Sequence, residues 1–422
     1  MIIIKSKVAS EKLLVFAALL TRVGSNVALF FALALLVSDR EFGELLLFFT
    51  ISTILACIIE FGLSTFILSK SNHSPIELRE LYCTIQSSRI FLAFPALAIY
   101  LLIVYLWPLP EAQAWSLSTP AKVSIFLACV FFTNAQTAET VLRAAGKVKN
   151  ELISASIGNA VFLICVIGSA FYFKQIDAIA FAMALGRAIH LTQSTLQTRR
   201  IAPLASKSRQ KVNKLQFLKT NRHFALQAVA ATAYLQVDSI IIGYLLGPEP
   251  VGNYQLFFRI VLGLGIVADA SASVKLKQIA GATGYKNQKS NHNNDKEKLL
   301  AVSVATIAAI MMFSLVIALN HNYVLSKPSS LFAENSFSLI EHCFLAAILS
   351  TLVFVRFLAA HLGVELTARS MQRVRSNGAV GALAIIVILC FIAIPFAGLP
   401  GAAFANLCGN IFIVSFYTKA LR

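Results

Sequence analysis

The sequence contains little charge, and acidic residues are its scarcest charged type. Only 13% of its 422 residues are charged, with 19 Asp or Glu against 36 Lys or Arg. A soluble chain usually has about a quarter of its residues charged. This scarcity argues against a soluble protein, and a mean hydropathy of +0.75 points to a membrane protein.

The sequence also lacks the usual motifs of nucleotide hydrolysis and metal binding. No Walker motif is present, so ATP is not expected to act on the chain directly. No spacing of His and Cys residues suggests a metal, and the seven Cys residues include no CxxC pair. The expected loops at 107–120 and 325–335 contain no cluster of His, Asp and Glu. We therefore expect no cofactor and no enzymatic activity.

Long apolar blocks make up most of the chain. Blocks of 20 or more apolar residues match a hydrocarbon core about 30 Å thick, which only helices or closed barrels can cross. Alternating segments of about ten residues, typical of barrel strands, are absent. The predicted fold class is an all-α integral membrane protein with about twelve transmembrane helices. We expect them at 12–37, 42–69, 81–107, 121–142, 151–173, 176–198, 223–246, 252–276, 299–324, 334–362, 376–397 and 399–420, and we interpret the first as a retained helix rather than a signal peptide.

The basic residues gather in alternate connections between these helices. The two most basic connections are 199–222 and 275–298, whereas the intervening connections carry almost no charge. The positive-inside rule therefore predicts that both termini are cytoplasmic. We expect the basic loops to contact anionic membrane lipids and not nucleic acid, because they lack interleaved aromatic residues.

The second half of the chain repeats the first. A shift of 209 residues aligns Phe42–Ser64 with Val251–Ser273 without a gap, and pairs Gly43 with Gly252. A shift of 223 residues pairs Gly158 with Gly381, residues 180–182 with 403–405, and Gly186 with Gly409. An even number of helices per half predicts a parallel repeat, with a cavity between the halves. The expected organisation is a six-helix lobe at 1–198, a basic cytoplasmic linker at 199–222 and a second six-helix lobe at 223–422.

Five arginines fall within the predicted spans, and four of them lie in the middle half of the bilayer core, where a charge costs several kcal/mol and is a functional candidate. At 1.5 Å per residue they lie roughly 10–16 Å from the nearer helix end. Guanidinium groups grip phosphate oxygens in a bidentate manner, so together they would form a cationic cavity for a phosphate-bearing substrate. The alternative for each is snorkelling to an interface or pairing with an acid, which we expect for a fifth arginine, Arg356. The four candidates are Arg22, Arg89, Arg187 and Arg259.

The acidic residues suggest either ion coupling or charge pairing, and both interpretations stay open. Asp238 is the deepest acid, in the outer third of its helix. Glu60 and Asp269 occupy equivalent positions of the repeat, near the cytoplasmic ends of their helices. His190 is interpreted as a packed polar residue.

Three motifs carry a family resemblance that extends over the whole chain. They are Ser38–Gly43 (SDREFG), Ile59–Leu63 (IEFGL) and Asp238–Tyr254 (DSIIIGYLLGPEPVGNY), the last followed by Arg259. With these motifs the chain resembles a polysaccharide-biosynthesis flippase of the multidrug/oligosaccharidyl-lipid/polysaccharide exporter superfamily.

The resemblance implies a transporter in the bacterial cytoplasmic (inner) membrane. Such proteins move an undecaprenyl-pyrophosphate-linked oligosaccharide, the repeat unit of O-antigen, capsule or exopolysaccharide, to the outer leaflet by alternating access. Family members often hold the pyrophosphate with cavity arginines, and Arg22 and Arg259 occupy comparable helices. The resemblance also implies possible coupling to protons, Na⁺ or the membrane potential, with a glycan polymerase and export machinery as candidate partners.

Other functional classes compete with this interpretation. An ion-coupled multidrug or cation antiporter of the same superfamily would rely on central acids, and the first predicted helix has none at its middle. A membrane-embedded glycan polymerase or transferase would form product without a bilayer. A non-transporting scaffold would tolerate loss of every charge within the spans.

Overall fold

The computed structural model describes residues 2–69, 75–107, 115–201, 214–264, 339–369 and 371–422, with the single residues 306 and 310. These ranges form helices and contain no strand. The helices are α1 (Ile2–Leu36), α2 (Asp39–Glu60), α3 (Leu63–Ser69), α4 (Pro75–Leu106), α5 (Thr119–Ala144), α6 (Val148–Phe173), α7 (Ile176–Ile201), α8 (Lys214–Tyr234), α9 (Val237–Leu245), α12 (Leu339–Ala368) and α13 (Gln372–Leu421). Residues 248–264 are also helical.

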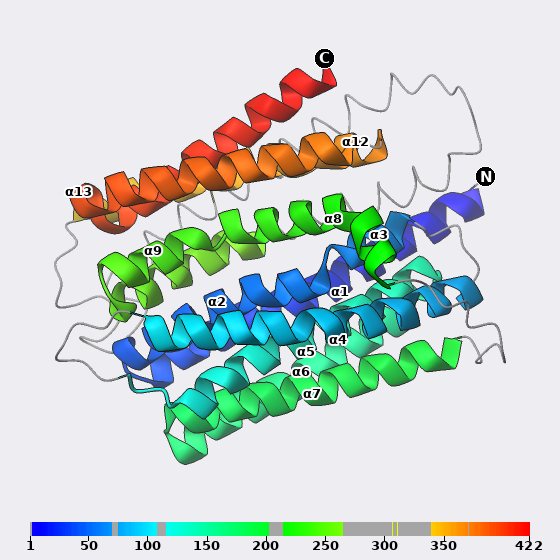
Figure 1. Cartoon of the computed structure of the whole chain (residues 1–422), viewed down its shortest axis with the longest axis horizontal. Helices are drawn as coiled ribbons and strands as arrows, with labels where there is room; N and C mark the ends of the chain where they lie inside the picture. The colour runs from blue at the N-terminus through cyan, green and yellow to red at the C-terminus, as the bar shows by residue number, and fades with distance from the viewer. Residues whose placement is uncertain are drawn as a thin grey trace.

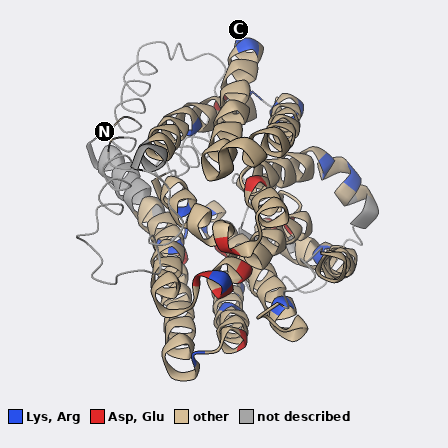
Figure 2. Cartoon of the chain, turned by 90° about the vertical axis from the view of Figure 1, so that its left-hand side faces the viewer, with Lys and Arg blue, Asp and Glu red and all other residues tan. Residues whose placement is uncertain are grey.

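Most of these helices are long and apolar enough to cross a membrane. Within the described ranges seven qualify singly, and α8 with α9 qualifies as an eighth bent by 45°. The long helices run along a common direction (Figure 1), and their ribbons carry few charged residues (Figure 2). The all-helical, multi-pass membrane fold is thereby confirmed. The count of twelve stays a prediction, because the helix expected at 299–324 lies almost entirely outside the described residues.

Local sequence signals explain where these helices begin and end. The SDREFG motif is a capping box, in which the Ser38 hydroxyl accepts a hydrogen bond from the Glu41 backbone N–H and the Glu41 carboxylate accepts one from the Ser38 N–H. The IEFGL motif ends α2, because Phe61 and Gly62 both adopt positive φ, at 58° and 68°. The predicted helix at 42–69 is therefore broken into α2 and α3.

Two further breaks differ from the predicted spans. The span expected at 223–246 bends between Tyr234 and Val237, which separates α8 from α9. Gly398 has φ 57° and ψ −134°, so it reverses the chain between the two predicted helices at 376–397 and 399–420, both of which belong to α13. Glycine adopts this conformation at little steric cost.

The helices pack as two groups. In the first half α5, α6 and α7 pack on one another and α1 packs on α6, whereas α12 and α13 pack together in the second half with α8 and α9 against α13. Arg369 at the end of α12 donates a 3.5 Å hydrogen bond to the carbonyl of Leu421, so α12 and α13 end side by side. We call this end of the second half its terminal end. The division into two six-helix lobes with a linker stays a prediction.

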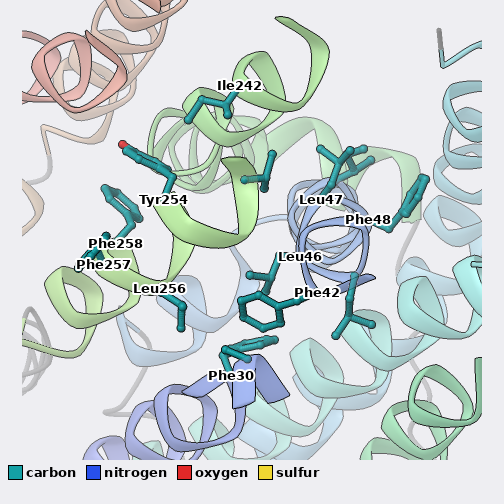
Figure 3. Close-up of a cluster of buried hydrophobic side chains, with 14 of the residues drawn as sticks. Phe30, Phe42, Leu46, Leu47, Phe48, Ile242, Tyr254, Leu256, Phe257 and Phe258 are labelled. Carbon is teal, nitrogen blue, oxygen red and sulfur yellow. The ribbon is translucent and has the colours of Figure 1, made fainter. Parts of the chain in front are cut away.

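The two halves meet through α2 and the helix at 248–264. Figure 3 shows the apolar core at this junction, where Phe42 and Leu46 of α2 lie near Phe30 of α1 and Leu256 of the 248–264 helix. Gly43 and Gly252 allow the two helices to approach closely. A Cβ atom on Gly252 would lie 3.4 Å from the Cα of Gly43.

Candidate functional site

A central cavity lies between the two halves and contains two of the four predicted arginines. Its lining comes from α1, α2, α5, α6 and α7 on one side and from the α8–α9 break and the 248–264 helix on the other. It encloses an empty volume of about 530 Å³. Arg187 and Arg259 supply its charge, and no Asp or Glu lines it among the residues that the structure describes. The site is therefore cationic.

Arg259 has the least satisfied guanidinium of the predicted set. Its guanidinium carbon lies 4.3 Å from the ring centroid of Phe30 and 5.0 Å from that of Phe49, a cation–π arrangement. Its Nε and Nη2 atoms are buried without a hydrogen-bond partner. Buried donors without partners are costly, so a ligand that accepts hydrogen bonds would be stabilised here.

Arg187 makes hydrogen bonds to neutral groups instead of acids. Its Nη1 and Nη2 atoms donate to the side-chain oxygens of Asn159 and Asn26, each at 2.8 Å. Its guanidinium carbon lies 3.5 Å from the Phe162 ring centroid and 4.1 Å from that of Phe132. These contacts fix the orientation of Arg187 without cancelling its charge.

Arg22 belongs to a buried ion network outside the central cavity. Its Nη2 atom lies 2.8 Å from a carboxylate oxygen of Glu139 and 2.7 Å from one of Glu151. Arg143 also pairs with Glu151, and His190 Nε2 lies 2.9 Å from Glu139. Two guanidinium groups thus face two carboxylates, which satisfies the requirement that buried charges be paired.

The sequence alone did not predict this network. Arg143 and Glu151 flank a short turn, and Glu139 lies four residues before Arg143 on one helix face. The closeness of Arg143 and Glu151 in the sequence, on either side of this turn, was the available signal for their ion pair. No local signal shows that α1 would place Arg22 between Glu139 and Glu151.

Arg89 and Glu60 connect α4 to the break after α2. Arg89 Nη2 donates to Thr137 at 2.7 Å and lies 3.5 Å from the Glu60 carboxylate. Glu60 also accepts the backbone N–H groups of Gly62 and Ser64, each at 2.7 Å. Neither residue lines the central cavity, and their contacts hold the α2–α3 break in place.

Asp238 forms a separate polar centre in the second half. It is fully buried and accepts hydrogen bonds from the Tyr254 hydroxyl at 2.6 Å and from the Asn406 amide at 2.9 Å. The Ser239 N–H donates to it at 2.8 Å. All three donors are neutral, so they leave the charge of the carboxylate uncancelled. A further predicted acid, Asp269, lies outside the described residues.

The fold identifies the class of protein. The chain is similar to the MATE multidrug transporter DinF-BH (TM-score 0.72, 14% identity, 98% of this chain and 94% of that one). It is also similar to the eukaryotic MATE transporter AtDTX14 (TM-score 0.68, 14% identity, 98% and 95%). A third similar structure is a MOP superfamily transporter from Pyrococcus furiosus described by the reverse polarity of its binding pocket (TM-score 0.69, 11% identity, 98% and 94%). The chain therefore has the fold of a multi-pass membrane transporter.

The family follows from the sequence match. The family model described as polysaccharide biosynthesis protein matches residues 14–274, more than half of the chain. The chain belongs to this family, which confirms the resemblance seen in its motifs. A search of curated protein sequences gives no match.

Proposed function

We propose that this protein flips an undecaprenyl-pyrophosphate-linked oligosaccharide from the cytoplasmic to the outer leaflet of the bacterial cytoplasmic membrane. The observation that carries the proposal is the central cavity with Arg187 and Arg259 and no acid among its described lining residues. An anionic head group supplies the missing countercharge. The family match supports a glycan-related substrate.

We assign different tasks to the arginines. Arg259, with Nε and Nη2 unpartnered, would grip the pyrophosphate, and Arg187 would add a second positive charge to the same cavity. Arg22 and Arg89 already contact acidic residues, so we assign them to supporting positions in the first half. The four predicted arginines thus divide into two at the cavity and two beside it.

Transport would proceed by alternating access. The cavity lies between the two halves, so a rocking motion of one half against the other would open it first to one leaflet and then to the other. The prenyl tail would stay in lipid. An interior-negative membrane potential, worth about 2.3 kcal/mol per charge per 100 mV, favours outward movement of the anion.

Return of the empty carrier would be coupled to a cation. Asp238 is our candidate for binding a proton or Na⁺, because its described partners are neutral donors. Glu60 is assigned to charge pairing with Arg89. No cofactor enters this cycle, and a glycan polymerase with its export machinery would use the delivered product.

Translocation of a lipid-linked oligosaccharide in proteoliposomes tests this proposal. Arg259→Gln and Arg187→Gln should each reduce transport at least about tenfold, the equivalent of about 1.4 kcal/mol of binding free energy. Arg40→Gln is the control, because Arg40 lies near the start of α2 and pairs with Glu44. Full transport by both cavity variants would overturn the proposal.

The multidrug transporters with the same fold make a cation antiporter the second candidate. The two arginines that line the cavity would repel a cationic drug. The similar transporter from Pyrococcus furiosus is itself described as having a binding pocket of reverse polarity. An antiporter would require Asp238 and would tolerate both arginine substitutions. Drug efflux from vesicles with the Arg187→Gln/Arg259→Gln double variant separates the two functions.

A further inference from the structure

A second cavity lies within the second half, apart from the central one. It is lined by α8, α12 and α13, and its empty volume, including the space at its open mouth, is about 870 Å³. Arg375, in the first turn of α13, and Tyr417, near its end, line the cavity at the terminal end. The Tyr417 hydroxyl donates a 2.9 Å hydrogen bond to the Arg375 carbonyl, which ties together the two parts of α13.

Arg356 lines this cavity from α12. Because α12 continues to Ala368, Arg356 is twelve residues, or roughly 18 Å, from the end of the helix. Its Nη1 atom is buried without a hydrogen-bond partner. Arg375 lines the same cavity and donates a 2.7 Å hydrogen bond from Nη1 to the hydroxyl of Thr367.

The internal repeat relates the position of this cavity to that of the ion network in the first half. The 223-residue shift pairs His190 with Ile413 and Ser194 with Tyr417, and both Ile413 and Tyr417 line the second cavity. In the first half this position is filled by the ion network, in which Glu139 contacts His190. In the second half the described lining residues include two arginines and no acid. Among the described residues, the same position is therefore balanced in the first half and cationic in the second.

We infer that the second cavity is a binding site for a phosphate-bearing anion. The two arginines supply charge-assisted donors, and Gln227 and Asn410 line the cavity with further amides. The two arginines come from α12 and α13, so both helices contribute charge to the site.

Two sources can supply this chemistry: the headgroup of an anionic phospholipid or a soluble phosphate compound. Their common feature is a phosphate with two or more free oxygens, which suits the fork of a guanidinium group. The site is distinct from the proposed transport site, because Arg356 and Arg375 do not line the central cavity. Binding here should therefore survive loss of Arg259.

The experiment uses the full-length protein in nanodiscs and introduces Arg356→Gln or Arg375→Gln into the Arg259→Gln variant, in which the proposed transport site no longer binds pyrophosphate strongly. Arg369→Gln is the matched control, since it removes the same charge from the exposed pair with Glu365 at the terminal end. Nanodiscs are made from phosphatidylcholine alone or from phosphatidylcholine with phosphatidylglycerol. Native mass spectrometry then measures how much phosphatidylglycerol stays bound to the protein. Titration with inorganic pyrophosphate in phosphatidylcholine nanodiscs measures the soluble source.

Relative to Arg259→Gln alone, we expect at least about tenfold weaker binding of one or both probes when Arg356→Gln or Arg375→Gln is added, and no change when Arg369→Gln is added. Retention of phosphatidylglycerol alone assigns the lipid source, and pyrophosphate binding alone assigns the soluble one. If Arg356→Gln fails to fold, Arg356→Lys replaces it in the experiment. Lysine keeps the charge but lacks the planar guanidinium group, so weaker binding is again expected. Unchanged binding of both probes to the folded Arg356 and Arg375 variants, or no binding to the unmodified protein, overturns the inference.

Discussion

Gly43 and Gly252, which the internal repeat pairs at a separation of 209 residues, contact each other across the junction of the two halves. A Cβ atom on Gly252 would lie 3.4 Å from the Gly43 Cα, and one on Gly43 would lie 2.0 Å from the carbonyl oxygen of Pro248. Equivalent residues meet in this way where a twofold axis passes between two copies of a unit. The contact agrees with the pairing of these two positions in the internal repeat, whereas the parallel arrangement of the two halves stays a prediction.

This contact makes Gly43 sensitive to substitution. Gly43→Ala would place a methyl group against the backbone of Pro248, so we expect it to lower the free energy of unfolding by about 1–3 kcal/mol. Gly168→Ala in α6 is the control, because a Cβ atom there meets nothing within 4 Å. Thermal unfolding of both variants in detergent measures the difference. Equal midpoints for the two would show that the helices can separate at little cost.

The ion network of the first half should depend on charge balance. Glu151→Gln leaves Arg22 and Arg143 facing Glu139 as their one remaining acid in the network, and removal of one member of a buried pair typically costs about 3–5 kcal/mol. Expression and thermal unfolding measure this loss. Glu365→Gln, which breaks the exposed pair with Arg369, should cost at most about 1 kcal/mol.

The double variant Arg143→Gln/Glu151→Gln tests the same balance from the other side. It removes one charge of each sign and leaves Arg22 paired with Glu139 at 2.8 Å. We expect it to be more stable than Glu151→Gln alone, because no guanidinium is left in excess. A double variant that is less stable than the single one would show that packing, not charge, sets the stability here.

Arg259 should not be replaceable by lysine. The planar guanidinium lies near the faces of two Phe rings, and a lysine ammonium offers neither this stacking nor a fork for pyrophosphate. We expect Arg259→Lys to reduce transport about tenfold, equivalent to about 1.4 kcal/mol. Arg40→Lys near the start of α2 should transport normally. Normal transport by Arg259→Lys would mean that charge alone suffices at this position.

Asp238 should affect coupling and not substrate binding. Asp238→Asn removes the charge and replaces the carboxylate with an amide of similar size, next to Tyr254 and Asn406. We expect normal binding of the lipid-linked oligosaccharide but no acceleration of transport by an imposed proton or Na⁺ gradient. Tyr254→Phe removes one donor and keeps the charge, so the gradient should still accelerate transport by this variant. Equal acceleration of the Asp238→Asn variant and the unmodified protein would exclude Asp238 as the coupling site.

Much of the fold was predictable because local signals determine it. The apolar blocks predicted the helices, and the SDREFG motif marks a helix start through the capping box of Ser38 and Glu41. The break at Phe61 and Gly62 was harder to predict, because the apolar pattern continues through it. There a Cβ atom on Gly62 would lie 2.2 Å from the carbonyl oxygen of Phe224, so a contact with α8 accompanies the break.

The sequence by itself determined that the chain is a helical membrane protein with arginines buried in its spans, since apolar length and charge position are local properties. Only the tertiary structure decided which arginines have acidic partners. Arg22 meets Glu139 and Glu151, whereas Arg187 and Arg259 share a cavity without a described acid. The reason is that depth along a helix follows from counting residues, while the partners of a side chain depend on which neighbouring helices its face meets.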